Sequence, residues 1–532
     1  MSDNEEGSVI DSSGPFGDAD ASRVDFQKLR TSFVNLSSTK IKVDESLGAD
    51  VSVRVIVGRR GAGKTLYLRS IQDYCRRLVT DSGSSVYVTA IDNEPPDTRL
   101  IIKITSWFDD NENLADETWR RIWKLVILRT VYSHIFCSKE LSKYANKGKK
   151  SYFINNFKQI LPSTRSPVSV FTQLTSLLSR FNSLKDLQDF LYLDEWADFE
   201  YEIGNILTKC PPMYFFIDQL DDDFANAPYH WLKCQYGLFS TVFRMIRNQI
   251  LGGKLHIVVC IREIVYTYIL QTQHGNKYLS ESKIKVLRWD QRLSKHFLDK
   301  KIETLNEKYF VSDAKSKNAE SFFGLSKVRL KRQGGIEEDI RSYVVRHTRL
   351  LPRDIINIGN VFCEEQNSQE SIQHFEDAVK NTVSKVAKQI AKDQLKMASI
   401  LICNSWIYNG AVEDGNLNFY TNESMLKPIN DNLCKLILHI GKDRFSKRAF
   451  SLTKRRKSSF GFGENDNPFN ALFRAGLLGY IELDPNGNKQ AIFFSESRNA
   501  QYNLPFHCDE YVFHPSLIDH LGIQPTGEPI YA

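Results

Sequence analysis

Long hydrophobic runs are missing from this chain of 532 residues. Its longest apolar stretches, such as MYFFI and LHIVVCI, have the length of a strand, well short of the roughly 20 residues of a membrane helix. Residues 1–22 are acidic and rich in glycine and serine, without the basic and apolar regions of a signal peptide. We therefore expect a cytoplasmic protein that does not contact a membrane.

Paired cysteine motifs are also missing. None of the nine cysteines forms CxxC, and His507 and Cys508 stand next to each other without a second ligand pair, so no zinc site is expected. Scattered cysteines are typical of free thiols in a reducing compartment. The chain lacks H-x-E…C-x-x-C and G-x-S-x-G, the motifs of deaminases and serine hydrolases. An effector enzyme, if the protein serves one, is expected on a separate chain.

A strong charge of one sign is missing as well. The net charge of +6 is too small to indicate nucleic-acid binding unless the basic residues cluster. They do so in SKVRLKRQGG (326–335) and in KDRFSKRAFSLTKRRKSSFGFG (442–463), where Phe445, Phe450 and Phe460 alternate with the charges. Basic side chains neutralise phosphates and aromatic rings stack on unpaired bases. The second segment supplies the candidates for DNA or RNA contact: Arg448, Lys454, Arg455, Arg456 and Lys457. The alternative is a solvated loop or a surface for an acidic protein.

What is present is an alternation of strands and helices. Apolar runs predict strands at 51–58, 98–107, 212–220 and 254–263, and helical spacing predicts helices at 65–79 and 236–250. This alternation favours an α/β fold with a parallel, three-layer core. The predicted divisions are a flexible or docking segment (1–45), a core (46–290) with a helical insertion at about 110–207, a helical lid (291–380) and a C-terminal helical domain (381–532).

Gly58 to Thr65 match the phosphate-loop pattern G-x-x-x-x-G-K-[ST], with a predicted strand before and a helix after. In such a loop the backbone N–H groups and the helix N-terminus face the phosphates. The lysine reaches the β- and γ-phosphates and the hydroxyl ligates Mg²⁺. We expect ATP with Mg²⁺ to bind here, through Gly58, Gly61, Ala62, Gly63, Lys64, Thr65 and Leu66.

An acid should stand behind the metal at the end of a neighbouring strand, and PMYFFIDQLDDD provides Asp218. Many ATPases of this kind carry a second acid directly after the first, where this chain has Gln219. Asp221 is the candidate for activating water, while Asp222 and Asp223 suit a helix cap. Slow hydrolysis, or a switch that mainly binds ATP, therefore remains open.

Two arginines are placed to contact the γ-phosphate. Arg262 follows the strand LHIVVCI, at the sheet edge where such folds bind ligands. Arg353 follows Pro352 at the start of a predicted lid helix. A guanidinium can contact phosphate in bidentate fashion. Their alternatives are an ion pair of Arg262 with Glu263, and an ordinary helix start with Asp354 as first-turn acid.

Together these motifs resemble bacterial P-loop ATPases of the AAA+/STAND type, including origin-recognition-like and anti-phage defence ATPases. LRWDQRLSKHFLDKKI (287–302) is similar to their approach to the lid, and LFRAGLLGYIEL with YVFHPSLIDHL to a winged-helix end. The resemblance implies ATP-dependent homo-oligomers in which a neighbour's arginine completes the site. Arg244 and Arg247 are weak candidates, and the favoured alternative for them is a solvated helix face. It implies a regulatory switch that controls assembly or a partner effector in defence. The alternatives are a DNA-binding ATPase in DNA maintenance or repair and an ATP-dependent scaffold.

Overall fold

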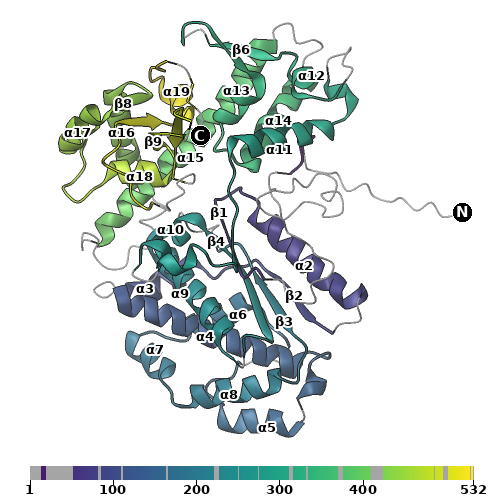
Figure 1. Ribbon diagram of the computed structural model, residues 1–532. Coiled ribbons are helices and arrows are strands. Elements are labelled where there is room, and N and C mark those ends of the chain that lie inside the picture. The colour runs from purple at the N-terminus through teal and green to yellow at the C-terminus, as the bar shows by residue number, and fades with distance from the viewer. Residues whose placement is uncertain are drawn as a thin grey trace, which may run out of the picture.

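The computed structural model describes residues 14–18, 52–81, 85–108, 112–145, 147–162, 166–220, 224, 227–249, 251–272, 275–310, 316–330, 333–368, 375–408, 423–484, 486–494, 501–527 and 529–530. These residues form an α/β core, a helical insertion, a mainly helical region at 291–368 that we call the lid, and a C-terminal domain (Figure 1). In this part of the chain, no helix is long and apolar enough to cross a membrane.

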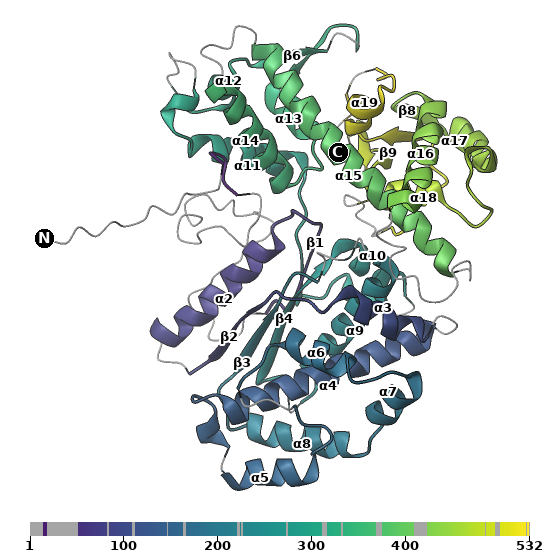
Figure 2. The same cartoon turned by 180° about the vertical axis from the view of Figure 1, so that it is seen from behind.

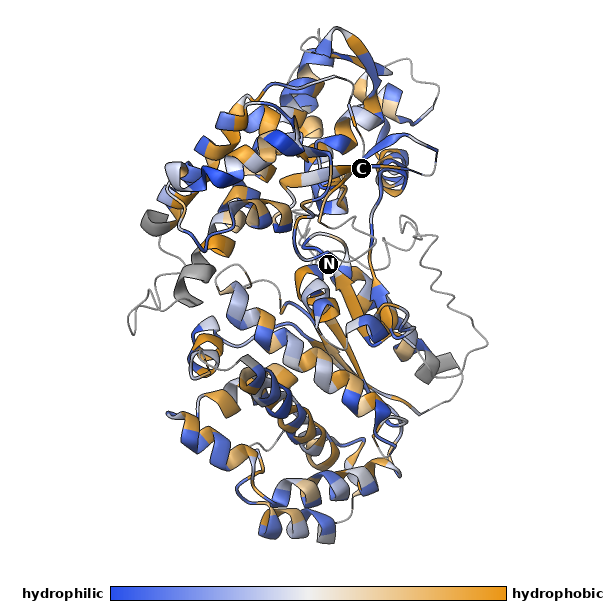
Figure 3. Ribbon diagram, turned by 60° about the vertical axis from the view of Figure 1, so that its left-hand side comes forward, coloured by the Kyte–Doolittle hydropathy of each residue, from blue (hydrophilic) through white to orange (hydrophobic). Residues whose placement is uncertain are grey.

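The core is a five-stranded sheet in which every pair of neighbours is parallel. Its order is β2-β3-β4-β1-β5. The strands are β1 (Val55–Gly58), β2 (Tyr87–Asp92), β3 (Met213–Ile217), β4 (Leu255–Arg262) and β5 (Ile284–Val286). The inner strands β1, β3 and β4 are apolar and mostly buried, as expected when helices cover both faces (Figure 3). The predicted parallel α/β core is confirmed.

Helices cover both faces of this sheet because the chain changes direction across it. The step from β1 to β2 runs one way across the strands, and the steps to β3 and β4 run back. Right-handed crossovers therefore place the connecting helices on opposite faces. Helix α2 (Lys64–Asp81) packs with Ile56 and Val258 on one face. Helices α4 (Glu112–Cys137) and α9 (Pro228–Arg247) pack with Val55 and Val259 on the other (Figure 2).

The prediction of a strand at 98–107 is wrong, because this segment forms helix α3 (Thr98–Ser106). The Asp97 side chain caps it by accepting the N–H of Arg99. Its buried residues Ile101, Ile104 and Thr105 recur at helical spacing. Short apolar runs fit a strand and a buried helix equally well, which explains the error. The second strand is β2, whose mixed sequence YVTAID gave a weaker signal.

A series of helices lies between β2 and β3. It contains α4, α5 (Lys147–Asn156), α6 (Val170–Leu178), α7 (Leu184–Leu191) and α8 (Glu195–Leu207). Trp119 and Trp123 of α4 are fully buried and pack in the core. Trp123 Nε1 donates to the Cys234 carbonyl at 2.8 Å. A Cβ on Gly237 would lie 2.6 Å from the Trp119 Cβ, so this glycine permits the close approach of α4 and α9.

The short helix α10 (Glu263–Gln271) lies between β4 and β5, and the lid begins after β5. The lid comprises α11 (Gln291–Glu303), α12 (Ala319–Phe323), the antiparallel strands β6 (Lys327–Leu330) and β7 (Ile336–Asp339), α13 (Ile340–Arg346) and α14 (Pro352–Ser368). Helix α15 (Phe375–Tyr408) runs from the lid to the C-terminal domain (Figure 1). Val379 and Val383 join the lid core, whereas Leu395 and Ile402 join the core of the C-terminal domain.

The C-terminal domain joins helices to an antiparallel sheet of order β10-β9-β11-β8. In chain order it contains α16 (Glu423–Ile440), β8 (Arg444–Ser446), α17 (Lys447–Arg455), α18 (Pro468–Arg474), β9 (Leu478–Leu483), β10 (Lys489–Ile492), β11 (Glu510–Phe513) and α19 (Ser516–Leu521). Short 3-10 turns lie at Ser142–Tyr144, Gly275–Tyr278, Glu307–Tyr309 and Lys457–Phe460.

Candidate functional site

The glycine-rich loop joins β1 directly to α2. Gly58 ends the strand, and Gly61 and Gly63 have φ of 91° and 92°, which glycine adopts without strain. Thr65 and Leu66 lie in the first turn of α2. A Cβ on Gly63 would meet no atom within 4 Å. The loop therefore leaves open space at its last glycine, beside the N–H groups that begin an 18-residue helix.

Neighbouring parts of the core hold this loop in shape. Lys64 is only 6% exposed, and its Nζ donates to the Arg59 carbonyl at 3.2 Å. The same carbonyl accepts the N–H of Ala62 at 3.1 Å. Trp289, which precedes the lid, donates its Nε1 to the Ala62 carbonyl at 3.0 Å. The loop is thus fixed by its own lysine and by the chain that leads into the lid.

Asp218 and Gln219 follow β3, at the same edge of the sheet as the loop because all five strands are parallel. Asp218 is 2% exposed, and its N–H donates to the Asp92 carbonyl at 2.9 Å. Gln219 has a φ of 57°, an uncommon conformation for a residue other than glycine. The residue that departs from the expected acidic pair is therefore also the one with a left-handed backbone. Asp221, Asp222 and Asp223 lie outside the described residues.

Gln235 of α9 links the ends of two strands, and the sequence reasoning missed it. Its side chain is fully buried. Its Nε2 donates to the Leu220 carbonyl at 3.0 Å, and its Oε1 accepts the N–H of Arg262 at 3.2 Å. A buried amide needs such partners. The sequence did contain a sign of this role, because Gln235 is a polar residue on the buried face of a largely apolar helix. An aliphatic residue would pack there without needing hydrogen bonds.

Asp92 was also missed, since β2 was not predicted. It ends β2, and its Oδ2 accepts the N–H of Phe171 at 2.7 Å. Burial raises the pKa of Asp92 to about 6, against the lowering effect of hydrogen bonds from Phe171, Ser169 and Val170. These contacts hold the N-terminus of α6, which is a structural role for this carboxyl group.

The two candidate arginines approach the loop from different domains. Arg262 pairs in register with Gly58, and its guanidinium lies 4.7 Å from the centre of the Phe224 ring. Arg353 of α14 lies against the loop, since a Cβ on Gly61 would be 2.9 Å from the Arg353 Cβ. The fold thus brings a core arginine and a lid arginine to the same short loop.

Both arginines line a cavity of 520 Å³ where core, lid and C-terminal domain meet. Its basic lining residues are Arg59, Arg60, Arg262, Arg349, Arg353, Lys396 and Arg474. Its acidic lining residues are Glu263, Asp354 and Asp393, so seven basic residues face three acidic ones. This excess suits an anionic group. Lys64, Thr65 and Asp218 are outside the cavity lining.

A tight turn positions the start of α14, and therefore Arg353. Leu350 has a φ of 60°, and its N–H donates to Thr348 Oγ1 at 3.0 Å. Arg349 Nε and Nη2 donate to the two carboxylate oxygens of Asp354 at 2.9 and 2.6 Å. Burial acts to raise the pKa of Asp354, but Arg349 outweighs it and holds that pKa below its ordinary value. The buried pair fixes the turn from which Arg353 projects.

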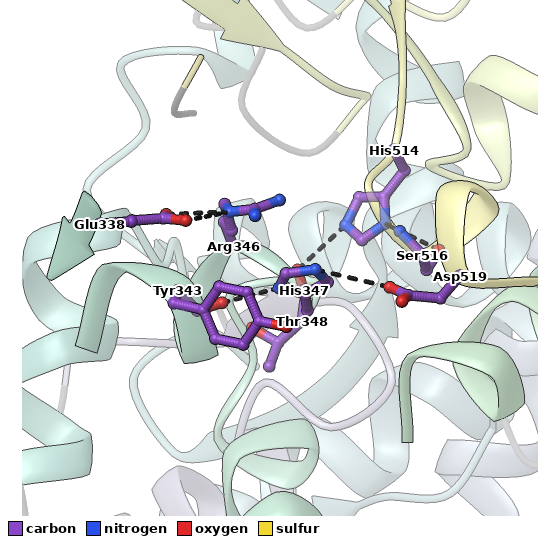
Figure 4. A network of polar contacts seen from close by, with 8 residues as sticks. All are labelled: Glu338, Tyr343, Arg346, His347, Thr348, His514, Ser516 and Asp519. Atoms are coloured by element: carbon purple, nitrogen blue, oxygen red, sulfur yellow. Dashed lines mark hydrogen bonds and ion pairs between the residues drawn. The ribbon is translucent and has the colours of Figure 1, made fainter. Parts of the chain in front are cut away.

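Histidines join the lid to the C-terminal domain beside this turn (Figure 4). His514 Nε2 contacts the Thr348 carbonyl at 3.0 Å, and its Nδ1 contacts Ser516 Oγ at 2.8 Å. His347 Nε2 lies 3.4 Å from Asp519 Oδ2. Burial lowers the pKa of His514 to about 4 and that of His347 well below its usual value. Both rings are therefore neutral at pH 7.

The loop itself touches the C-terminal domain through Arg59. A Cβ on Gly476, which has a φ of 77°, would collide with Arg59 Nη2. Arg59 also lines a small crevice with Arg346 and His514. Core, lid and C-terminal domain consequently all contact the residues between Gly58 and Lys64.

The basic segment 442–463 is mostly helical, so it is not the solvated loop that was one of the expected alternatives. It forms β8, α17 and a 3-10 turn. Arg448, Lys454, Arg455 and Arg456 are exposed, whereas the half-buried Lys457 donates to the Asp466 carbonyl at 2.6 Å. Phe445 and Phe450 are buried, and the Phe450 ring centre lies 4.4 Å from that of Tyr511. These two rings pack inside the domain and are not available to stack on bases.

The next helix, α18, is covered. Phe469, Leu472 and Phe473 are buried, and Arg474 Nη2 donates to Asn503 Oδ1 at 2.6 Å. Arg474 also stacks on the Tyr502 ring at 3.8 Å. Of these two helices, α17 presents a row of basic side chains to solvent and α18 does not.

The described residues contain no group of three or more His, Cys, Asp and Glu side chains placed to hold a metal ion. A nucleotide-bound Mg²⁺ does not need such a cluster, because it uses one or two carboxylates with phosphates and water. The oxygen donors of Thr65 and Asp218 are of the type that Mg²⁺ prefers. Compared with models of known protein families and with curated protein sequences, the chain gives no match.

Proposed function

We propose that this protein is a regulatory P-loop ATPase that binds ATP with Mg²⁺ at Gly58–Leu66. The observation that carries the proposal is the convergence on this loop. A strand, a helix N-terminus, the core Arg262 and the lid Arg353 meet at a few residues. A loop with only a structural role would not need two arginines and an excess of positive charge beside it.

In this proposal each group has one task. Lys64 and the first N–H groups of α2 hold the β- and γ-phosphates, while Thr65 and Asp218 hold Mg²⁺. The bound metal supplies charge neutralisation during phosphoryl transfer. Arg262 and Arg353 contact the γ-phosphate from two domains, which makes the position of the lid depend on the nucleotide. The excess of basic residues attracts the triphosphate to the junction.

Turnover is a separate question from binding. Gln219 stands in place of the usual second acid, and an amide cannot take a proton from water. Asp221 is the remaining candidate for this role. We propose slow hydrolysis, with the change of lid position as the main output. That output would act on assembly or on a partner effector protein, in anti-phage defence.

Binding is tested by titrating the protein with a fluorescent ATP analogue in the presence of Mg²⁺. Lys64→Ala should weaken the affinity at least about tenfold, since it removes a charge-assisted hydrogen bond to phosphate. Lys185→Ala, an exposed lysine in the insertion, is the matched control and should leave the affinity unchanged. Equal affinity of the wild type and Lys64→Ala would refute the proposal.

Assembly is tested by measuring molar mass in solution with and without a non-hydrolysable ATP analogue. We expect a nucleotide-dependent homo-oligomer, and an unchanged monomer would favour a simple binding module. Arg244 and Arg247 lie in the last turn of α9, at the amino end of β4. They lie away from the loop edge of their own sheet. Both side chains are exposed, which fits a solvated helix face, and in an assembly only a neighbour's site would be within their reach.

Nucleic-acid binding is the second candidate function, and the exposed basic side chains on and just after α17 favour it. Arg448, Lys454 and Arg455 lie on this helix, and Arg456 follows it directly. The order helix, strand, two helices and β-hairpin agrees with a winged-helix domain. In helix-turn-helix proteins the second helix reads the bases. That position falls on α18, which is covered, so we propose contact with the nucleic-acid backbone rather than sequence reading.

A further inference from the structure

The lid encloses a short turn from the N-terminal part of the chain. Gly14, Pro15, Phe16 and Gly17 form a β-turn, in which the Gly17 N–H donates to the Gly14 carbonyl at 2.8 Å. Pro15 at the second position and Gly17, with a φ of 101°, at the fourth favour this turn locally. The turn is thus partly preformed by its own sequence.

The side chain of Phe16 is the anchor of this contact. It is 1% exposed, and its ring centre lies 5.3 Å from that of Phe322 on α12. Gly359 of α14 lies under the ring, where a Cβ would collide with three of its carbon atoms. An apolar side chain buried in a fitted pocket is the usual energetic centre of a recognition site.

The side-chain amide of Asn360 forms hydrogen bonds with the backbone of the same turn. Asn360 Oδ1 accepts the N–H of Phe16 at 2.8 Å, and Asn360 Nδ2 donates to the Gly17 carbonyl at 3.0 Å. One side-chain amide therefore satisfies a donor and an acceptor of the turn. A Cβ on Gly14 would collide with the Asn360 side chain, and Gly17 has a left-handed φ of 101°, so glycine is favoured at both positions.

We propose that the lid carries a peptide-recognition site for a Gly-Pro-aromatic-Gly turn, and that the protein's own residues Gly14–Asp18 are its ligand. The pocket around the Phe16 ring and the close approach at the glycines select the turn by shape. The Asn360 amide selects it by hydrogen bonds to its backbone. The N-terminal segment is then held to α14, the same helix that carries Arg353. The proposal is independent of nucleotide binding.

The test uses the full-length Phe16→Ala variant and a fluorescently labelled peptide of residues 11–21. Binding is measured by fluorescence anisotropy. The variant, whose own turn has lost its anchor, should bind the peptide saturably. The wild type should bind it at least about tenfold more weakly, because its tethered turn competes at high effective concentration.

Matched variants separate specific recognition from adhesion. A peptide carrying Phe16→Ala, or a Phe16→Ala/Asn360→Leu protein, should reduce binding at least about tenfold. Phe16→Ala/Glu364→Gln, which alters an exposed residue of the same helix, should bind like Phe16→Ala. Thermal melting checks that each variant is folded. Equal binding by the wild type and Phe16→Ala, or by the two peptides, would overturn the proposal.

Discussion

Arg353 of the lid lies directly on Gly61 of the glycine-rich loop, close enough that a Cβ on Gly61 would be 2.9 Å from the Arg353 Cβ. The first turn of α14 and the loop therefore occupy adjoining space without room for a side chain between them. Any change in the shape of this loop must alter its contact with the lid.

Substitutions at the two left-handed glycines should differ in their effect on stability. Gly61→Ala and Gly63→Ala both place an L-residue at a φ near 90°, at a cost of about 1–2 kcal/mol each. Only Gly61→Ala also crowds Arg353, whereas a Cβ at Gly63 has no neighbour within 4 Å. We expect Gly61→Ala to lower the free energy of unfolding by about 1 kcal/mol more, measured by urea denaturation without nucleotide. An equal effect in the two variants would speak against the close approach of Arg353.

Breaking the buried pair at the lid turn should be costly. Asp354→Asn leaves the Arg349 guanidinium without its carboxylate, which typically costs about 3–5 kcal/mol in the free energy of unfolding. Asp377→Asn, at an exposed acid on α15, should change stability by less than about 0.5 kcal/mol. A double variant, Arg349→Met/Asp354→Leu, should recover most of the stability, because no isolated charge remains. Chemical denaturation of the three variants checks these values.

Acidification should loosen the contact between lid and C-terminal domain. The pKa of His514 falls from 6.5 to about 4 through burial, so the folded protein binds fewer protons than the unfolded chain between these values. The contribution of the neutral His514 ring to the free energy of unfolding is therefore complete above pH 6.5. It disappears as the pH falls towards 4, which lowers the free energy of unfolding by about 3 kcal/mol. Wild type should lose more stability than His514→Asn between pH 7.5 and 5.0. Parallel pH profiles for the two proteins would contradict this.

Placing an acid at position 219 tests why turnover should be slow. In Gln219→Glu a carboxylate occupies the position expected for a catalytic acid, and phosphate release should rise at least about tenfold. Gln219→Ala removes the amide without adding a base and should not raise the rate. If Gln219→Glu is no faster than wild type, the missing acid is not what limits hydrolysis.

Replacing the basic side chains on and after α17 tests the second candidate function. Changing Arg448, Lys454, Arg455 and Arg456 to Ala should weaken DNA binding and flatten its dependence on salt concentration. The logarithmic slope should change by about 0.9 for each phosphate that is no longer neutralised. Lys185→Ala/Lys209→Ala, at exposed positions between β2 and β3 and outside both basic clusters, is the control. An unchanged slope in the four-residue variant would exclude this surface from nucleic-acid binding.

The sequence predicted the parallel core because the strands and the loop have strong local signals. Continuous apolar runs such as MYFFI are buried on both sides, and the glycine pattern requires a strand before and a helix after it. Arg262 was expected at the end of a strand, and in the structure it ends β4 and pairs in register with Gly58. The helix expected to begin at Pro352 is α14, and it brings Arg353 next to Gly61.

Contacts between distant segments were beyond the sequence patterns. Gln235, His514 and Gly476 acquire their roles from residues far away along the chain, and no spacing rule connects them. The helix α3 was predicted as a strand because its run of isoleucines suits either structure until the neighbouring sheet decides. Phe445 and Phe450 were candidates for stacking on bases. Their burial could not be predicted from the local sequence because it comes from contacts with β11 and α18.

Helix α15 gives this architecture a mechanical property. It has 34 residues in one continuous rod, about 51 Å long, with its first turns packed in the lid and its later turns in the C-terminal domain. A tilt of about 10° at the lid end would carry the far end through about 9 Å. A rod of this length thus amplifies a small rotation near the loop into a displacement large enough to open or close a protein surface.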